Sequence, residues 1–288
     1  EHYVTALADR HAFEYRAEAE SAGFLYVSML YDDCIARGKS LVDGGVRYRG
    51  GVIETFGMVN TADSLAAIKR LVYDQKRITL EQMAAVLDAD FEGYERERRL
   101  ILGAPKYGND DEYVDRIAQA VSDHVSRFTY EQARRIGFQY FLIVNINNYA
   151  NVSMGKHTAA SADGRRNGAP LANGNTPTAG NDTCGVTAFL NSIAKLDPSA
   201  HAGYVHNIKF SKQVFREDRA KVSALLKAYF ANGGTQAMIT VVGRGDLEAA
   251  LREPEKYRNL IVRVGGFSAR FVELARDVQM DLIQRTLY

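Results

Sequence analysis

Apolar residues recur at helical spacing through most of the first 130 residues. The spacing predicts a helix over 61–75, with Asn60 or Thr61 as its N-cap. The residues T-L-E-Q at 79–82 resemble a capping box, in which a Thr and a Gln side chain each accept a hydrogen bond from the other residue's backbone N–H. A further amphipathic helix begins near residue 110. This part of the chain is therefore predicted to be mainly helical.

The second half alternates between two kinds of pattern. Compact apolar runs rich in β-branched and aromatic residues predict strands over 140–146, 237–242 and 260–264. Helical spacing predicts helices over 186–193, 217–230, 246–257 (capped by Asp246) and 277–286. Strands that alternate with helices favour an α/β fold with a buried sheet, and no Pro/Ser-rich linker separates independent domains.

Residues 147–185 match neither pattern, because they are polar and rich in glycine. An irregular stretch of this length inside a compact domain is unusual and is often functional. It contains D-G-R-R-N-G at 163–168. That segment fits an anion cradle and fits equally a tight turn whose arginines pair with carboxylates, and the residues alone leave both readings open.

Composition excludes several classes of protein. The 288 residues carry 36 Lys+Arg and 35 Asp+Glu, a balance that excludes a strongly basic nucleic-acid binder. No apolar run approaches the roughly 20 residues of a membrane span. Cys34 and Cys184 cannot build a disulfide framework, and no secretory signal is visible, so a reduced cytoplasmic setting is expected.

Metal and nucleotide motifs are absent as well, including the phosphate loop, G-x-G-x-x-G after a strand, H-E-x-x-H and G-x-S-x-G. His201 and His206 lie five residues apart, and we read them as solvated or hydrogen-bonded side chains rather than metal ligands. The acidic run at 109–112 is interpreted as the start of a helix, where carboxylates favour the dipole, rather than as a cation site.

The pair Gly265-Gly266 lies between two apolar segments. The simplest interpretation is a hairpin-like turn in which glycine supplies a positive φ. Surface turns are usually polar, however, and apolar flanks are typical of a buried segment. A glycine turn of this kind indicates that a ligand or another segment of the protein approaches the backbone closely at this point.

Residues 263–272 read R-V-G-G-F-S-A-R-F-V and resemble the C-terminal radical loop of glycyl radical enzymes, whose pattern is R-V-x-G-[Y/F]. Further blocks of the chain resemble the same family in the same order: 33–38, 61–69, 104–111, 163–174 and 279–286. The resemblance therefore covers nearly the whole chain.

The resemblance implies that Gly266 stores an organic radical on its α-carbon, installed by a radical-SAM activating enzyme, with no bound cofactor and no metal. Only glycine lets that carbon flatten without a clashing side chain. Residues implied to support the radical loop are Arg263, Gly265, Phe267 and Ser268, with Asp163, Gly164 and Arg165 as a supporting loop. Because a persistent radical must be kept from water and oxygen, the loop is expected to be buried.

In the family, a cysteine thiyl abstracts hydrogen from the substrate, and neither Cys34 nor Cys184 fits its G-C-[V/I]-E-like loop. The chain is thus expected to be the C-terminal half of such an enzyme, partnered by an N-terminal half or subunit that carries the cysteine. The implied fold is half of a ten-stranded α/β barrel over 1–245 plus a glycyl radical domain over 246–288.

The activity implied by the resemblance is oxygen-sensitive, anaerobic cleavage of a C–O or C–C bond in a small polar metabolite, by a lyase or dehydratase. The alternatives are a pyruvate formate-lyase proper, a non-catalytic spare part for a cleaved enzyme, and a structural domain with a degenerate loop. A homodimer is among the expected assemblies, whereas nucleic acid and membrane are not expected partners.

Overall fold

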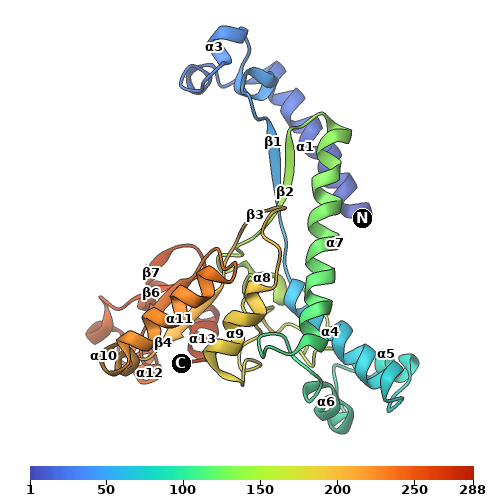
Figure 1. The fold of residues 1–288 in the computed structure, drawn as a ribbon, viewed down its shortest axis with the longest axis vertical. Coiled ribbons are helices and arrows are strands. Elements are labelled where there is room, and N and C mark those ends of the chain that lie inside the picture. Colours follow the sequence, from blue (N-terminus) through green and yellow to red (C-terminus); the bar gives the residue numbers. More distant parts are fainter. The chain divides into compact units, whose positions relative to one another are not determined.

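The computed structural model describes residues 1–288, which form two compact units that are each described by themselves (Figure 1). The first unit comprises Glu1–Glu54, Asp123–Val144 and Ser199–Gly203. The second comprises Thr55–Ser122, Asn145–Pro198 and Tyr204–Tyr288. The long helix α7 (Glu112–Ile136) contributes its beginning to the second unit and its remainder to the first.

The first unit is built on a small sheet with strand order β1-β2-β3. Its elements are α1 (His2–Ser21), α2 (Leu25–Ser28), α3 (Cys34–Arg37), a π-helical turn (Leu41–Gly45), β1 (Gly50–Glu54), β2 (Tyr140–Asn145) and β3 (His201–Tyr204). Strand β2 confirms the strand predicted over 140–146, and it pairs in parallel with β1, with Gly50 opposite Tyr140. Its residues alternate between buried and half-buried, so only one face of the strand enters the core.

The second unit holds most of the helices. They are α4 (Met58–Ile68), a π-helical turn (Lys69–Asp74), α5 (Leu80–Asp88), α6 (Glu95–Leu102), α8 (Ala150–Gly155), α9 (Gly185–Ala194), α10 (Lys212–Glu217), α11 (Arg219–Ala231), α12 (Arg244–Arg252) and α13 (Arg276–Gln284), with 3₁₀ turns at Pro254–Tyr257 and Phe271–Glu273. Its strands are β4 (Asn207–Phe210), β5 (Met238–Val241), β6 (Ile261–Arg263) and β7 (Ser268–Arg270). β4 and β5 pair in parallel, whereas β6 and β7 form an antiparallel hairpin.

Two N-cap predictions for these helices are wrong. Helix α4 is capped by Gly57, in a left-handed conformation, rather than by Asn60 or Thr61. Asn60 is buried inside the helix, where its side chain donates to Asp163 and accepts from the backbone N–H of Ala172. Asp246 lies within the first turn of α12, whose N-cap is Gly243. The capping box of α5, by contrast, is confirmed.

Other elements differ from the sequence pattern in detail. The helix predicted over 217–230 is α11, which begins at Arg219, and a separate short helix, α10, precedes it. The segment 147–185, predicted to lack regular structure, contains the two-turn helix α8. Strands β1, β3 and β4 were not predicted from periodicity. The α/β fold itself is confirmed by the mixture of helices with two parallel strand pairs.

One hydrophobic cluster of the second unit draws its buried residues only from the C-terminal part of the chain. They are Val242, Leu247, Ala250, Val262, Val264, Phe271, Val278, Leu282 and Ile283. The hairpin β6–β7 is thereby packed against α12 and α13, so the C-terminal segment has an apolar core of its own.

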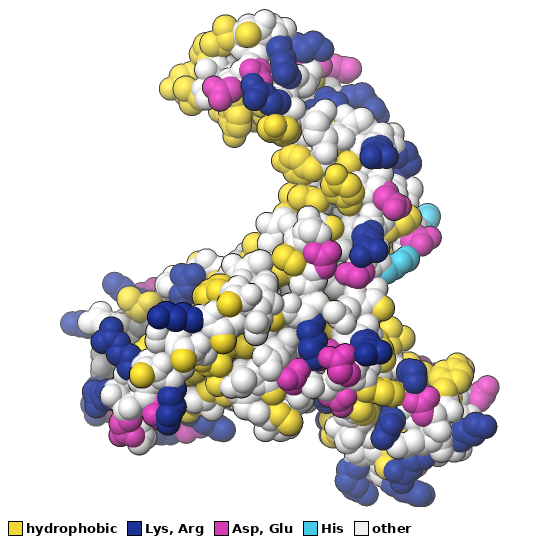
Figure 2. Space-filling model, viewed as in Figure 1, with side chains coloured by type: hydrophobic (Ala, Val, Ile, Leu, Met, Phe, Trp, Pro, Cys, Tyr) yellow, Lys and Arg dark blue, Asp and Glu magenta, His cyan; other side chains and the backbone are white.

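The first unit leaves an unusual number of large apolar side chains exposed between Phe24 and Ile35. Figure 2 shows these hydrophobic side chains gathered around the segment labelled α3 in Figure 1. Separately, none of the helices combines the length and the apolar character that crossing a bilayer requires.

Candidate active site

Gly265 and Gly266 form the two-residue turn of the β6–β7 hairpin, as the sequence predicts. Arg263 pairs with Ser268 at the end of the ladder. The backbone N–H of Val264 then donates to the carbonyl of Phe267 at 2.9 Å, which closes the turn.

The structure closes one turn position to a side chain and makes a side chain at the other strained. A Cβ at Gly265 would lie 2.3 Å from the carbonyl oxygen of Asn148, a backbone atom that cannot move aside. Gly266 has a φ of +103°, which L-residues rarely adopt, and its Cβ would lie 3.1 Å from Oδ1 of Asn148. Gly265 is therefore required by the close approach of the Asn148 backbone, whereas Gly266 is favoured by its positive φ.

The segment that approaches the turn is Ile146–Asn148, directly after strand β2. Asn147 and Asn148 both have positive φ, a conformation that asparagine tolerates better than most residues. The N–H of Asn148 donates to the carbonyl of Ile146 at 2.8 Å and so tightens the bend. From another side, the N–H of Gly266 donates to Sδ of Met238, the first residue of β5, at 3.2 Å.

The expectation of a fully buried radical loop is wrong for this chain taken alone. Val264 and Gly265 are buried, but Gly266, Phe267 and Ser268 are exposed. The physical reason is that Ile146–Asn148 and Met238 cover only part of the turn.

The side chains predicted to support the loop are arranged across the hairpin. Nη1 of Arg263 donates to Oγ of Ser268 at 3.1 Å, which links the two strands next to the turn. The carbonyl of Arg263 accepts from Nη1 of Arg285, at 3.5 Å, just beyond the end of α13. Phe267 is 37% exposed, so it does not anchor the turn in the core.

Asp163, Gly164 and Arg165 do not contact the glycine turn. Arg165 is buried, and its guanidinium donates to backbone carbonyls of its own loop, including Ala169 at 2.7 Å and Thr158 at 3.2 Å. Nη1 of Arg166 donates to the carbonyl of Asp90 at 2.7 Å. Both arginines thus donate to backbone carbonyls, so the pairing with carboxylates, one of the two readings of this segment, is wrong.

Asp163 instead anchors this loop to helix α4. Its carboxylate accepts from Nδ2 of Asn60 at 2.7 Å and from Oγ of Ser161 at 2.6 Å. The neighbouring Asp63 accepts from the N–H of Tyr107 at 2.8 Å, and burial raises the pKa of Asp63 to about 7. The loop is therefore held by buried polar groups that satisfy one another.

A network of asparagines connects the irregular segment to the glycine turn. Nδ2 of Asn173 donates to the carbonyl of Asn148 at 3.0 Å and to Oδ1 of Asn151 at 2.9 Å. Asn207 donates to Oδ1 of Asn173 at 3.0 Å, and the N–H of Gly174 donates to Oδ1 of Asn147 at 2.8 Å. Sequence analysis missed this network, although the density of asparagines at 145–151 and 173–175 was a visible signal.

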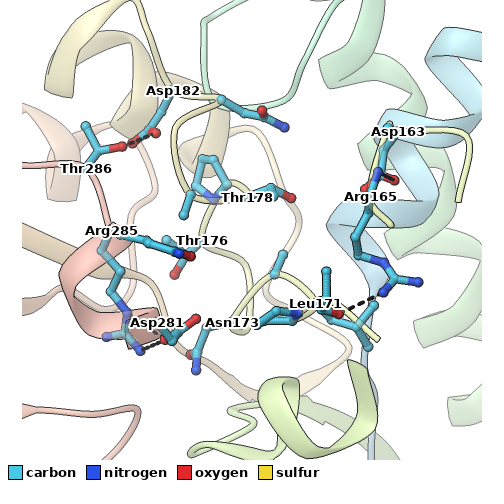
Figure 3. Close-up of a pocket in the computed structure, with 18 of the residues that line it drawn as sticks. Asp163, Arg165, Leu171, Asn173, Thr176, Thr178, Asp182, Asp281, Arg285 and Thr286 are labelled. Atoms are coloured by element: carbon cyan, nitrogen blue, oxygen red, sulfur yellow. Dashed lines mark hydrogen bonds and ion pairs between the residues drawn. The ribbon is translucent and has the colours of Figure 1, made fainter. Parts of the chain in front are cut away.

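A cavity of about 380 Å³ lies beside this network (Figure 3). Asp163 and Arg165 line one side, and Asp281, Arg285 and Thr286 of the C-terminal segment line the other. Asp182 binds the end of the chain through the hydroxyls of Thr286 and Tyr288. The C-terminal segment is thereby tied to the irregular segment by polar contacts.

Neither cysteine lies in the contacts around Gly266. Cys34 is buried against Gly45 in the first unit, and Cys184 is exposed at the start of α9, where its N–H donates to Oδ1 of Asn109. His206 is buried and in contact with the Tyr229 hydroxyl, and burial lowers its pKa to about 3. No group of three or more His, Cys, Asp or Glu side chains is placed to hold a metal ion.

Two family models match the chain. The pyruvate formate lyase-like model matches residues 1–152, and the glycine radical model matches residues 171–272. The chain therefore belongs to the pyruvate formate lyase-like family and contains a glycine radical domain, as the resemblance predicts.

Similar proteins support the same placement. The chain is 38% identical over 280 residues to the probable dehydratase YbiW of Escherichia coli, and 35% identical over 270 residues to a (2S)-3-sulfopropanediol dehydratase of Klebsiella oxytoca. These matches cover 93% and 91% of this chain but only 34% and 33% of the relatives. The chain thus spans about a third of the length of the curated relatives it matches.

Solved structures confirm the fold. The glycerol-bound B12-independent glycerol dehydratase from Clostridium butyricum superposes with a TM-score of 0.91 at 37% identity, covering 95% of this chain and 35% of that one. A glycyl radical enzyme from Archaeoglobus fulgidus superposes with a TM-score of 0.90 at 32% identity, covering 98% and 37%. The expected pyruvate formate-lyase type of α/β fold is confirmed.

Proposed function

We propose that this chain is the radical-bearing part of a glycyl radical enzyme, with the radical on Gly266. The observation that carries the proposal is a turn that favours glycine at both positions: a backbone oxygen closes the Cβ position of Gly265, and Gly266 has a φ of +103°. A radical carbon must flatten, and glycine alone allows this without a clash. The radical supplies hydrogen-atom abstraction, which protein side chains do not perform unaided.

The proposed reaction is cleavage of a C–O bond in a small polar metabolite, that is, a dehydration. The two relatives named above are dehydratases, and so is the solved structure with bound glycerol. Other relatives are named isethionate sulfite-lyase and indoleacetate decarboxylase, so cleavage of a C–S or C–C bond is the second candidate. The relatives favour these reactions over a pyruvate formate-lyase proper.

The match over residues 1–152 argues against a spare part that replaces only a radical segment. We assign residues 246–288 to the glycyl radical domain and 1–245 to the barrel part, because all but one of the buried residues of the C-terminal apolar cluster, Val242, lie in 246–288.

The thiol that passes hydrogen between Gly266 and substrate is proposed to come from an N-terminal half, on the same polypeptide or on a separate subunit. Cys34 is buried in the first unit. Cys184 contacts Asn109, whereas the residues that contact Gly266 are Ile146, Asn148 and Met238. A radical-SAM activating enzyme is the proposed second partner. The exposed side of Gly266 is the side from which such partners reach it.

Electron paramagnetic resonance tests the assignment. After anaerobic treatment with a radical-SAM activating enzyme, the protein should give a glycine-centred doublet, and Gly266→Ala should abolish it. The control is Gly245→Ala, because a Cβ at Gly245 meets no atom within 4 Å. A doublet that persists in Gly266→Ala would refute the assignment.

Exposure to air gives a second readout of the same residue. Oxygen should cut the activated chain at Gly266, which mass spectrometry detects as two fragments, and Gly266→Ala should stay intact. An activated wild-type chain that survives air without cleavage would contradict the proposed radical position.

A further inference from the structure

One α-hydrogen of Gly266 points at a side chain of this protein. The position that a Cβ would occupy lies 3.1 Å from Oδ1 of Asn148 and 3.3 Å from Cγ2 of Ile146. One of the two C–H bonds of Gly266 has that same direction. One face of the α-carbon is therefore covered by a carboxamide and a methyl group, while Gly266 as a whole remains exposed.

The backbone of Asn148 is fixed rather than free to drift. Its carbonyl accepts from Asn173, which is only 6% exposed and is itself bound to Asn151 and Asn207. Its φ of +46° lies in the left-handed region. Because the same carbonyl blocks the Cβ position of Gly265, the backbone of Asn148 sets where the turn lies, and its side chain reaches on to Gly266.

We infer that Asn148 is a positioning residue for the radical glycine. Its carboxamide, with Ile146, closes one face of the Gly266 α-carbon and holds the turn in register. Hydrogen-atom donors and dioxygen then reach this carbon only from the opposite face. The inference rests on the proposed function, and it adds a residue that lies far from the glycine turn in the sequence.

Three variants separate the side chain from the backbone. Asn148→Gly removes the carboxamide but keeps a residue that adopts a positive φ without steric strain. Asn148→Asp keeps the shape, the φ tolerance and an oxygen beside Gly266. Asn232→Gly is the control, since Asn232 is an exposed asparagine at the end of α11.

The first measurement needs no radical. Hydrogen–deuterium exchange of the unactivated protein, read on peptides that span 264–268, should be faster in Asn148→Gly and unchanged in Asn148→Asp and Asn232→Gly. Peptides from α12 and α13 should exchange as in the wild type, which separates loss of loop positioning from general unfolding. Unchanged exchange of the turn in Asn148→Gly would overturn the inference.

The second measurement uses the activated protein. Since two faces of the carbon rather than one would be open, oxygen cleavage at Gly266 should be about twofold faster in Asn148→Gly. Asn148→Asp should restore the wild-type rate. Equal rates in wild type and Asn148→Gly would contradict the shielding. A wild type that gives no glycine doublet would instead contradict the proposed function, and the exchange experiment would still test Asn148.

Discussion

Lys209 on β4 is a lysine that the fold buries almost completely, at 5% exposure. Its ammonium donates to the carbonyls of Leu282 and Ile283, at 3.2 Å each, near the end of helix α13. Carbonyls at a helix C-terminus lack partners within the helix and carry partial negative charge. Lys209 therefore links helix α13 to strand β4.

Burial, with the nearby Arg285 and Arg244, lowers the pKa of Lys209 from 10.5 to about 8. The unfolded chain then binds a proton that the folded chain lacks between these two values. Lys209 therefore makes the unfolding free energy rise as pH increases through this window, and the gain is lost as pH falls back through about 8.

The substitution Lys209→Met tests this linkage. The unfolding free energy of the wild type, relative to Lys209→Met, should increase by about 3 kcal/mol between about pH 8 and pH 10.5. Urea denaturation across this range measures it. Lys227→Met, at an exposed lysine of α11, should leave the wild-type pH dependence unchanged. A difference between wild type and Lys209→Met that is flat with pH would contradict the burial argument.

At the level of single residues, sequence reasoning located the glycine turn but not its surroundings. The turn is local, since a positive φ at Gly266 is a property of adjacent residues. The contact of Asn148 with Gly266 joins residues more than a hundred positions apart, and no spacing rule reports such a contact. The hydrogen-bond partners of Arg165 could not be predicted for a related reason. They are backbone carbonyls, which every residue carries, so no residue type in the sequence indicates them.

At the level of elements, capping residues and hydrophobic periodicity determined which helices and strands were predicted correctly. Helix α5 was found because its capping box lies within four consecutive residues. The start of α4 was misplaced because asparagine is a common N-cap residue. The carboxamide of Asn60 instead forms hydrogen bonds with Asp163 and with the backbone N–H of Ala172. β1 and β4 were missed because glycine or polar residues interrupt their apolar pattern, and their pairing with β2 and β5 is what stabilises them.

The capping box gives a prediction for one element. In α5, the Thr79 hydroxyl accepts from the N–H of Gln82 at 3.2 Å, and the Gln82 side chain accepts from the N–H of Thr79 at 2.8 Å. Thr79→Ala should lower the unfolding free energy by about 1 kcal/mol. Thr79→Ser keeps the hydroxyl and should lose much less. Chemical denaturation of both variants measures the difference, and equal losses would show that the hydroxyl is not the stabilising group.

At the level of the whole molecule, the sequence indicated the fold class, and the resemblance indicated the family. Neither could indicate how the strands pair, because parallel strands such as β1 and β2 come from residues about ninety positions apart. The predicted burial of the radical loop failed at this scale also. A local apolar pattern reports that a segment can be covered, but which segment covers it is decided by the rest of the molecule.

The exposed apolar segment of the first unit is the other feature that appears only at this scale. Leu25, Leu30 and Ile35 are 74%, 71% and 73% exposed, within a run that also exposes Phe24, Tyr26, Val27, Met29 and Tyr31. Isolated exposed apolar residues are ordinary, whereas a contiguous patch favours association. We therefore expect this protein to bind an apolar fluorescent dye and to self-associate as its concentration rises, which also tests the predicted homodimer.

The double variant Leu25→Gln/Leu30→Gln tests the patch, since both side chains are largely exposed and Gln makes them polar. Dye fluorescence should fall and association, followed by analytical ultracentrifugation, should weaken, while the thermal unfolding midpoint stays the same because neither side chain is buried. Leu80→Gln, at a leucine 45% exposed on α5, is the control and should change neither readout. A lower midpoint in the double variant would mean that these leucines pack within the folded chain, and unchanged association would place the contact surface elsewhere.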